Sequence, residues 1–417
     1  MLEAQHPSHR SLDDVDDWAS VAKGLRAHAL DCLQTSFGLI ADRAHGAGAH
    51  LAMGARCGLE TRAGNRFDGL RPTLDDRLAE AGELLGLRAV ARWSSLDGPE
   101  LRRSVAETTS LYVVGDAFHL PWGPYAGHES MAHSFVLLAQ RAGRYTVIDA
   151  YHNDTAWGPA RPGTWQLSAE ELDAAVAAGA DALALEAGPR PTLEVPTVLA
   201  DNAERLRNAT PAIRRYLAAA RSQLPGLEGI ERLVLDIWLL SRERTLHVEW
   251  LADVGQPHAA AAEQARQWQR LATQSYIALR RARRGEPAEP GVLDRVTELF
   301  SRDVELAGQR ADVARAHPVH EAVLDALRGS LNVDDETVRT SATLRDLPGF
   351  TSFRLVDVIE RVERRLGIEL APGAIVAANL SDLAGLCRLF QDACPARERD
   401  GSPGERPSMT ERWPEAP

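Results

Sequence analysis

The sequence predicts an α+β domain at the N-terminus, an all-helical middle region and a small helical bundle at the C-terminus. Short β-branched or aromatic runs bounded by Gly, Pro and Arg are typical of strands, and they lie at 110–115, 134–139 and 145–148. Strand signals end at Pro196, after which residues 203–312 are rich in Ala, Arg and Leu with helical periodicity. The stretch 352–370 places apolar residues at three- and four-residue steps, which predicts an amphipathic helix of the final bundle.

The length favours several domains, because 417 residues exceed one typical hydrophobic core. We expect a first domain at 1–195, a helical companion domain at 196–312, the bundle at 318–395 and a tail at 396–417. That tail is too polar to bury a core, so we expect it to be disordered. Prolines are expected to interrupt the middle helices at Pro211, Pro225, Pro257 and 287–290. Candidate hinges are 285–291 and 313–318.

Composition and charge exclude several classes of function. The net charge is −12, and 47 Lys and Arg are scattered among 59 Asp and Glu. This argues against a nucleic-acid partner, since phosphate binding needs a concentrated basic face. No stretch approaches the roughly 20 apolar residues that span a bilayer, and the polar start has no signal-peptide core. We therefore expect no membrane partner and a cytoplasmic location.

The four cysteines are expected to be free thiols. Their spacing shows no metal-like pairing, and their density is too low for a disulfide scaffold. They are Cys32, Cys57, Cys387 and Cys394. Any of them could therefore be a nucleophile.

Ser352 stands at the start of the most amphipathic helix of the chain, where N-cap residues sit. The stripe behind it consists of Leu355, Val356, Ile359, Val362 and Leu366. A helix at 320–331 precedes it, and another at 379–390, with Ser381 as its expected cap, follows. A helix cap is one interpretation of Ser352, and an attachment point for a prosthetic group is the other.

From His320 to Gln391 the pattern resembles an acyl or peptidyl carrier protein. The resemblance implies 4'-phosphopantetheine as a covalent cofactor on Ser352, attached by a separate phosphopantetheinyl transferase. Thr351 and Phe353 stand where carriers usually have Asp and Leu. The expected partners are this transferase and an acyl-loading enzyme or other carrier proteins.

Cys32 is the best candidate nucleophile, because it lies where a short polar turn runs into the apolar helix expected at 27–44. A thiol at a helix N-terminus feels the positive end of the helix dipole, which favours the thiolate. A buried structural cysteine is the alternative. We expect Cys57, Cys387 and Cys394 to be buried structural cysteines.

His133 and Asp149 are the candidate base and orienting carboxylate. They lie on two consecutive strands of a hairpin, and the register of that hairpin decides whether the side chains meet. With a five-residue loop at 140–144, Asp149 falls opposite Phe135, and His133 becomes its diagonal neighbour on the same face. A two-residue loop would place the pair on opposite faces. A hydrogen-bonded strand histidine and a turn-forming aspartate are the alternative interpretations.

Taken together, Cys32, His133 and Asp149 follow the logic of nucleophile, base and orienting group. Their order along the chain is that of papain-like enzymes. Three motifs around them, Asp116–Trp122, His128–His133 and Val147–Asp149, resemble the butirosin-biosynthesis H protein family. That resemblance implies a papain-like acyltransferase fold. It also implies transfer of an acyl or aminoacyl group from a carrier thioester to an amine of a small molecule.

The oxyanion donor is not settled by the sequence. Papain-like enzymes often have Gln about six residues before the nucleophile, where this chain has Arg26. The backbone N–H of Cys32 with Gln34 or His28 would then have to serve. His119 and His128 are not spaced from His133 as zinc ligands are, so we expect no metal centre.

The two halves of the chain predict one activity, because a cysteine thiol can accept an acyl group from a thioester by exchange. We expect an acyltransferase fused to its carrier, with a small-molecule acceptor. Two alternatives stay open. The same triad would serve a thioesterase or cyclase, and a degenerate domain would be a non-catalytic scaffold that docks partners around the carrier.

Overall fold

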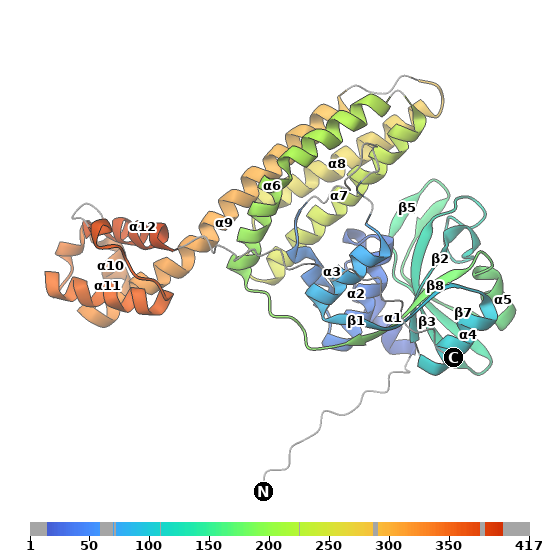
Figure 1. Ribbon diagram of the computed structural model, residues 1–417, viewed down its shortest axis with the longest axis horizontal. Coiled ribbons are helices and arrows are strands. Elements are labelled where there is room, and N and C mark those ends of the chain that lie inside the picture. Colours follow the sequence, from blue (N-terminus) through green and yellow to red (C-terminus); the bar gives the residue numbers. More distant parts are fainter. Residues whose placement is uncertain are drawn as a thin grey trace, which may run out of the picture. The chain divides into compact units, whose positions relative to one another are not determined.

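The computed structural model in Figure 1 describes residues 15–58, 70, 72–108, 110–224, 226–286, 291–375 and 380–394. The chain divides into two compact units, residues 1–310 and 311–417. The first unit therefore holds both the sheet and the middle helices. The tail expected at 396–417 and part of the hinge expected at 285–291 lie outside the described residues.

The first unit is built on a six-stranded antiparallel sheet with strand order β1-β8-β2-β3-β4-β7. The strands are β1 (Leu87–Leu96), β2 (Ser110–Asp116), β3 (Ala132–Arg141), β4 (Arg144–Asp149), β7 (Gly163–Leu167) and β8 (Ala180–Ala187). A separate two-stranded ribbon joins β5 (Asn153–Thr155) and β6 (Gly158–Ala160). The three strands expected from the sequence are β2, β3 and β4, and they lie side by side.

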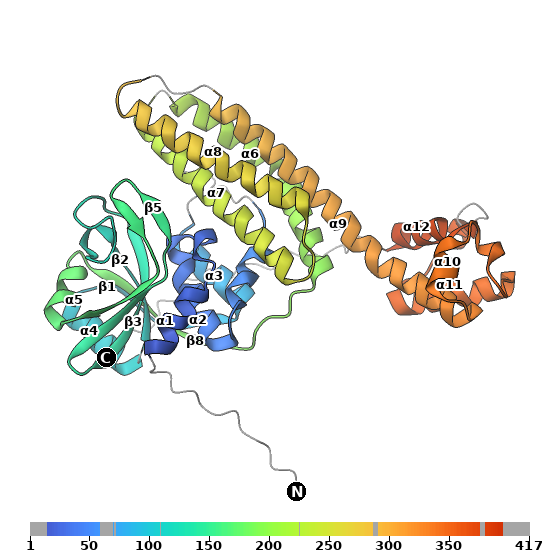
Figure 2. The ribbon, with the colours of Figure 1, turned by 180° about the vertical axis from the view of Figure 1, so that it is seen from behind.

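Helices cover both faces of this sheet, as Figures 1 and 2 show. One face carries α1 (Val15–Gly24), α2 (Cys32–His45) and α3 (Leu74–Leu85), and the other carries α4 (Gly98–Thr108) and α5 (Ala169–Ala175). Successive strand residues alternate between the two cores: Tyr112 packs with α2, and Val113 packs with α4. The sheet is buried on both sides, which explains the nearly continuous apolar runs of its central strands.

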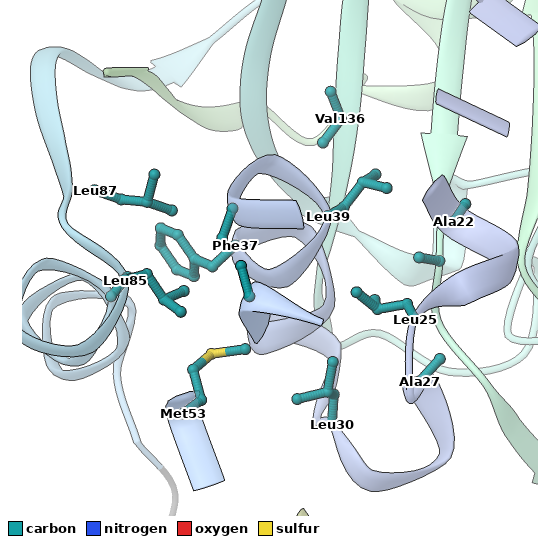
Figure 3. Close-up of a cluster of buried hydrophobic side chains, with 14 of the residues drawn as sticks. Ala22, Leu25, Ala27, Leu30, Phe37, Leu39, Met53, Leu85, Leu87 and Val136 are labelled. Atoms are coloured by element: carbon teal, nitrogen blue, oxygen red, sulfur yellow. The ribbon is translucent and has the colours of Figure 1, made fainter. Parts of the chain in front are cut away.

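The core between α2 and the sheet fixes the position of α2, the helix that begins at Cys32. Figure 3 shows Phe37 among Leu85, Leu87 and Met53. Phe37 is fully buried and stacks on Tyr112 with 4.3 Å between ring centroids. Burying a side chain of this size contributes about 2 to 3 kcal/mol, so the helix is held firmly on β2 and β3.

The β3–β4 hairpin has the register that brings residues 133 and 149 onto one face. Val136 pairs with Ile148 and Leu138 with Thr146, so Asp149 falls opposite Phe135, as expected. The expected five-residue loop is wrong in detail. The chain reverses in the two residues Ala142 and Gly143, both with positive φ. A register shift between Leu138 and Arg141 then moves the pairing by one residue and restores the common face.

Four long helices form the middle of the chain: α6 (Val195–Gln223), α7 (Leu227–Asp253), α8 (Ala259–Ala282) and α9 (Val292–Leu331). The interruption expected at Pro257 lies between α7 and α8, and those expected at Pro225 and at 287–290 lie outside the described residues. The interruption expected at Pro211 is wrong, since α6 continues through it. The hinge expected at 313–318 follows the boundary of the two units after Arg310, but α9 continues through it and through Pro318. Neighbouring packing outweighs the hydrogen bond that each proline removes.

Helix α7 packs closely on the first domain. Its backbone approaches the 3₁₀ segment η2 (Ala49–Ala55) so tightly that a Cβ on Gly54 would lie 2.3 Å from the carbonyl oxygen of Leu246. Only glycine fits there. His247 donates from Nδ1 to the carbonyl of Gly54 at 2.7 Å, which ties the same two elements together.

The second unit is a small helical bundle. The end of α9 packs with α10 (Asp335–Thr340), α11 (Ser352–Leu366) and α12 (Leu383–Ala393) around one core that includes Val323, Leu327, Val358, Val362 and Phe390. Both expected caps are displaced by one residue. Thr351 rather than Ser352 caps α11, accepting from the N–H of Arg354, and Asp382 rather than Ser381 caps α12. In each pair the neighbour's oxygen reaches the free N–H groups of the first turn.

Candidate active site

Cys32 is the first residue of α2, and the sequence around it fixes that helix start. The side chain of Asp31 accepts hydrogen bonds from the backbone N–H groups of Leu33 and Gln34 at 2.9 and 2.8 Å. Gln34 completes the capping box by accepting from the N–H of Asp31. Arg77 pairs with the Asp31 carboxylate and holds the cap in place. The thiol thus stands at the positive end of a 14-residue helix.

Cys32 contacts the two residues of strand β3 that precede and follow His133. The Cys32 Sγ lies 3.5 Å from the carbonyl oxygen of Ala132, the residue before the histidine. The hydroxyl of Ser134, the residue after it, donates to the carbonyl oxygen of Cys32 at 2.5 Å and contacts the hydroxyl of Ser36 at 2.8 Å. The helix start is therefore fastened to the strand that carries the imidazole.

His133 and Asp149 meet as the register requires. The two atoms His133 Nε2 and Asp149 Oδ2 are 2.7 Å apart, and both side chains are buried. The same carboxylate accepts from Trp122 Nε1 at 3.0 Å and from the backbone N–H of Tyr151 at 2.9 Å. Three donors fix this carboxylate, so the orientation of the imidazole is fixed as well.

The charge state of His133 follows from its surroundings. Burial lowers its pKa, but the Asp149 carboxylate, together with hydrogen bonding and charge interaction with Cys32, outweighs burial and raises the pKa to about 10. Nε2 is engaged by Asp149, and Nδ1 is buried without a well-formed hydrogen bond among the described residues. Nδ1 is thus the nitrogen left to exchange a proton with the thiol.

The two expected oxyanion donors differ in availability. Gln34 is buried, and both atoms of its amide are engaged, since Oε1 accepts from Asp31 and Nε2 contacts the Glu80 carboxylate at 3.3 Å. His28 is about half exposed, and burial lowers its pKa, so its imidazole is neutral at pH 7. The N–H of Cys32 itself has no carbonyl in its own helix to bond. It is the donor best placed by the backbone.

An aromatic pocket adjoins the imidazole. Its walls include Trp122, Tyr125, Tyr151 and Trp165, with Arg161 at one side. The ring of Tyr151 meets that of His133 edge-on, with centroids 5.1 Å apart, and Cys32 packs against the small cluster containing Tyr125 and Tyr151. Aromatic walls limit the access of water, which strengthens electrostatic interactions such as that between His133 and Asp149.

Arg242 on α7 is the residue that sequence reasoning missed. It is buried, and it donates to the carbonyl oxygens of Ala27, Leu30 and His152. Its guanidinium lies over the ring of Trp238, 4.3 Å from the centroid. One side chain of the middle helices therefore links the segment before Cys32 to the segment after Asp149.

Ser352 lies in the second unit, exposed in the first turn of α11. Its hydroxyl has no hydrogen-bond partner among the described residues, because the capping role belongs to Thr351. The adjoining Phe353 is 87% exposed and Val356 is 52% exposed. A free hydroxyl at a helix N-terminus suits the phosphate of a prosthetic arm, since both the dipole and the free N–H groups favour an anion there.

These features define the second unit as a carrier domain. Residues 321–389 match the family model of the phosphopantetheine attachment site. The cofactor of this domain is 4'-phosphopantetheine, covalently attached to Ser352. When bound, it supplies a thiol that holds acyl groups as thioesters. The chain thus takes part in carrier-linked biosynthesis, and it interacts with a phosphopantetheinyl transferase and other biosynthetic enzymes. No curated protein matches the chain.

Among the described residues, no group of three or more His, Cys, Asp and Glu side chains is placed to hold a metal ion. No helix in the same part of the chain is long and apolar enough to cross a membrane.

Proposed function

We propose that the chain is a cysteine-dependent acyltransferase with a papain-like N-terminal domain, acting in natural-product biosynthesis. The observation that carries this proposal is the position of His133, which interacts with both Cys32 and Asp149 at the N-terminus of α2. The same polypeptide holds a carrier domain that presents acyl thioesters. A thiol paired with an imidazole is the chemistry that takes an acyl group from a thioester at little cost in free energy.

The reaction has two steps: the Cys32 sulfur first gains the acyl group and then passes it on. In the first, Sγ attacks the acyl carbonyl carbon, the bond from that carbon to the leaving sulfur breaks, and His133 Nδ1 gives its proton to the leaving sulfur. In the second, an amine or another nucleophile of a small molecule attacks the acyl-cysteine. His133 Nδ1 takes the proton of the acceptor, and Cys32 Sγ leaves. Asp149 stays ionised and orients the ring throughout.

Two outcomes other than transfer share these residues. Water or an internal nucleophile as the acceptor would make the protein a thioesterase or cyclase. The other outcome is a non-catalytic scaffold. The amide of Gln34 is already hydrogen-bonded and cannot serve as an oxyanion donor, which favours this outcome because loss of one such donor costs on the order of 100- to 1000-fold in rate.

The test follows the acyl group by mass spectrometry. A promiscuous phosphopantetheinyl transferase and a panel of acyl-coenzyme A donors load Ser352, and peptide mapping then locates the acyl group with time. We expect it to appear on Cys32 in the wild type, to stay on Ser352 in Cys32→Ala, and to move normally in Cys394→Ala. Cys394 is a matched control because it is another partly exposed free thiol.

Acceptor competition separates the enzymatic outcomes. With a panel of small amines present, transfer gives amide products, whereas hydrolysis releases free acid at a rate that the amines do not change. If no donor acylates Cys32 and iodoacetamide labels it no faster than Cys394, the triad is inert and the scaffold interpretation replaces the proposal.

A further inference from the structure

A second pocket lies in the first unit, among α7, α8, α9 and the segment after η2. It is lined by Cys57, Arg244, His247, Gln264, Asp303 and Arg310, all of them buried. None of these residues belongs to the candidate active site. The pocket is unusual because two guanidinium groups, from Arg244 and Arg310, face it from neighbouring helices.

The hydrogen bonds of the pocket are incomplete. Asp303 is fully used, since its carboxylate accepts from Arg244 Nε at 2.9 Å, from Gln264 Nε2 at 2.7 Å and from Trp268 Nε1 at 3.2 Å. Arg244 Nη2 and Arg310 Nε and Nη1 are buried and have no partner among the described residues. A buried donor without a partner costs about 1 to 3 kcal/mol, and more when it is charged.

The ion pairs of the pocket are unevenly shared. Asp303 and the partly exposed Glu243 both pair with Arg244, and Arg310 has no ion pair among the described residues, although the charge of Asp303 acts on it. Cys57 does not supply a negative charge, because burial raises the pKa of its thiol to about 11. Burial and Arg310 lower the pKa of His247 to about 3, so the imidazole is neutral. Arg310 is therefore a buried guanidinium without a paired carboxylate.

We propose that this pocket binds a small monovalent anion of the size of chloride, held by Arg310 Nε and Nη1 and by Arg244 Nη2. Both arginines line one small space and come from two helices, and an acceptor-only ion between them would satisfy these donors. His247 donates from Nδ1 to Gly54, so its bare Nε2 needs a donor. A water molecule that donates to both Nε2 and the anion completes the set.

The site would act on stability rather than on chemistry. Arg244 also donates to the carbonyl oxygen of Gly58 at 3.1 Å, and His247 holds Gly54, so the anion would lie where the middle helices meet the first domain. Binding only to the folded state stabilises it by mass action. The proposal is independent of the acyltransferase proposal, because neither Cys32 nor His133 enters the argument.

The test is thermal unfolding of the full chain in chloride and in gluconate, which is too large to enter, at matched ionic strength. We expect the midpoint of the wild type to rise by about 2 °C for each tenfold increase in chloride above the dissociation constant. Arg310→Met should abolish this rise without lowering the midpoint in gluconate, because it removes buried donors that have no partner among the described residues. Arg295→Met, an exposed arginine of the same helix, is the matched control and should keep the rise.

Two results would overturn the proposal. An equal wild-type midpoint in chloride and gluconate means that the pocket holds water only, and a chloride effect that survives Arg310→Met places the ion elsewhere. Should Arg310→Met fold poorly, Arg310→Lys keeps the charge but lacks the Nε donor, and its rise should be smaller. Chloride-35 relaxation provides a second readout, with excess line broadening in the wild type that Arg310→Met removes.

Discussion

Asp149→Asn is the sharpest single perturbation of the candidate triad. The wild-type carboxylate accepts from His133, Trp122 and the N–H of Tyr151. An amide has only one oxygen, so one of its ends must present a donor to another donor, at a cost of about 1 to 3 kcal/mol. In the arrangement that keeps Tyr151 satisfied, the amide N–H₂ faces His133 Nε2, which selects the wrong tautomer of the imidazole.

The electrostatic effect is larger than the steric one. Burial lowers the pKa of His133, and Asp149 is the main group that raises it to about 10. Without the carboxylate, burial should dominate and bring the pKa to its ordinary value of about 6.5 or below. A shift of about 3 units corresponds to on the order of 4 kcal/mol in the stability of the imidazolium. We therefore expect a loss of about 100- to 10,000-fold in acyl transfer to Cys32.

The assay is nuclear magnetic resonance of labelled histidine with parallel alkylation of Cys32, both as a function of pH. In the wild type the His133 resonances should report an imidazolium up to about pH 9, whereas Asp149→Asn should show a neutral ring at pH 8. Asp154→Asn, an exposed change in the neighbouring ribbon, is the control. A pKa of His133 that stays near 10 in Asp149→Asn would refute the reasoning, because the carboxylate would then not be its cause.

Three further predictions concern stability. His133 has a folded-state pKa above its unfolded value, so its contribution to the free energy of unfolding is complete below about pH 6.5 and is lost as pH rises toward 10. The difference in unfolding free energy between wild type and His133→Gln should therefore shrink over that range. A difference that is independent of pH would contradict this. Gly54→Ala should lower the unfolding free energy by about 2 kcal/mol or more, measured by urea denaturation, because its Cβ meets the Leu246 carbonyl; an unchanged midpoint would show that η2 can move aside. Arg242→Met should cost about 2 to 5 kcal/mol and slow Cys32 acylation, whereas exposed Arg266→Met should do neither.

The hairpin shows what a sequence can and cannot predict about this site. A five-residue loop was the assumption that placed Phe135 opposite Asp149, and the register of the β3–β4 pair extends to that placement. The turn was not predictable, because the register depends on a shift between Leu138 and Arg141 that no residue pattern announces. The common face of His133 and Asp149 was thus expected for a loop length that the chain does not have, and the sequence alone left the register open.

Three strands and the contacts of Arg242 could not be predicted from the sequence for a different reason. Strands β1, β7 and β8 carry weaker patterns; the interior of β1, for example, mostly alternates exposed and partly buried residues rather than forming an apolar run. The contacts of Arg242 could not be predicted because its partners are far away in the sequence: Leu30 is 212 residues away and His152 is 90. Such contacts are a matter of tertiary packing, and local propensity says nothing about them.

The link through Arg242 leads to a prediction about the first domain on its own. A fragment ending at residue 195 keeps the sheet and the candidate triad but loses α7. It would expose the surface around Gly54 that α7 covers, and the carbonyl oxygens that Arg242 binds at 27, 30 and 152 would lose their buried donor. The segments next to Cys32 and Asp149 would then be held only by contacts within the first domain, such as the pair of Arg77 and Asp31.

We therefore expect residues 1–195 alone to unfold at a lower temperature than residues 1–310 and to acylate Cys32 at least tenfold more slowly from a carrier supplied in trans. Removing residues 311–417 from the full chain should leave both properties of the first unit unchanged, since that unit is compact by itself. Equal stability and acylation in the two fragments would mean that the middle helices are a separable companion. In that case the buried guanidinium of Arg242 would have no part in shaping the cleft.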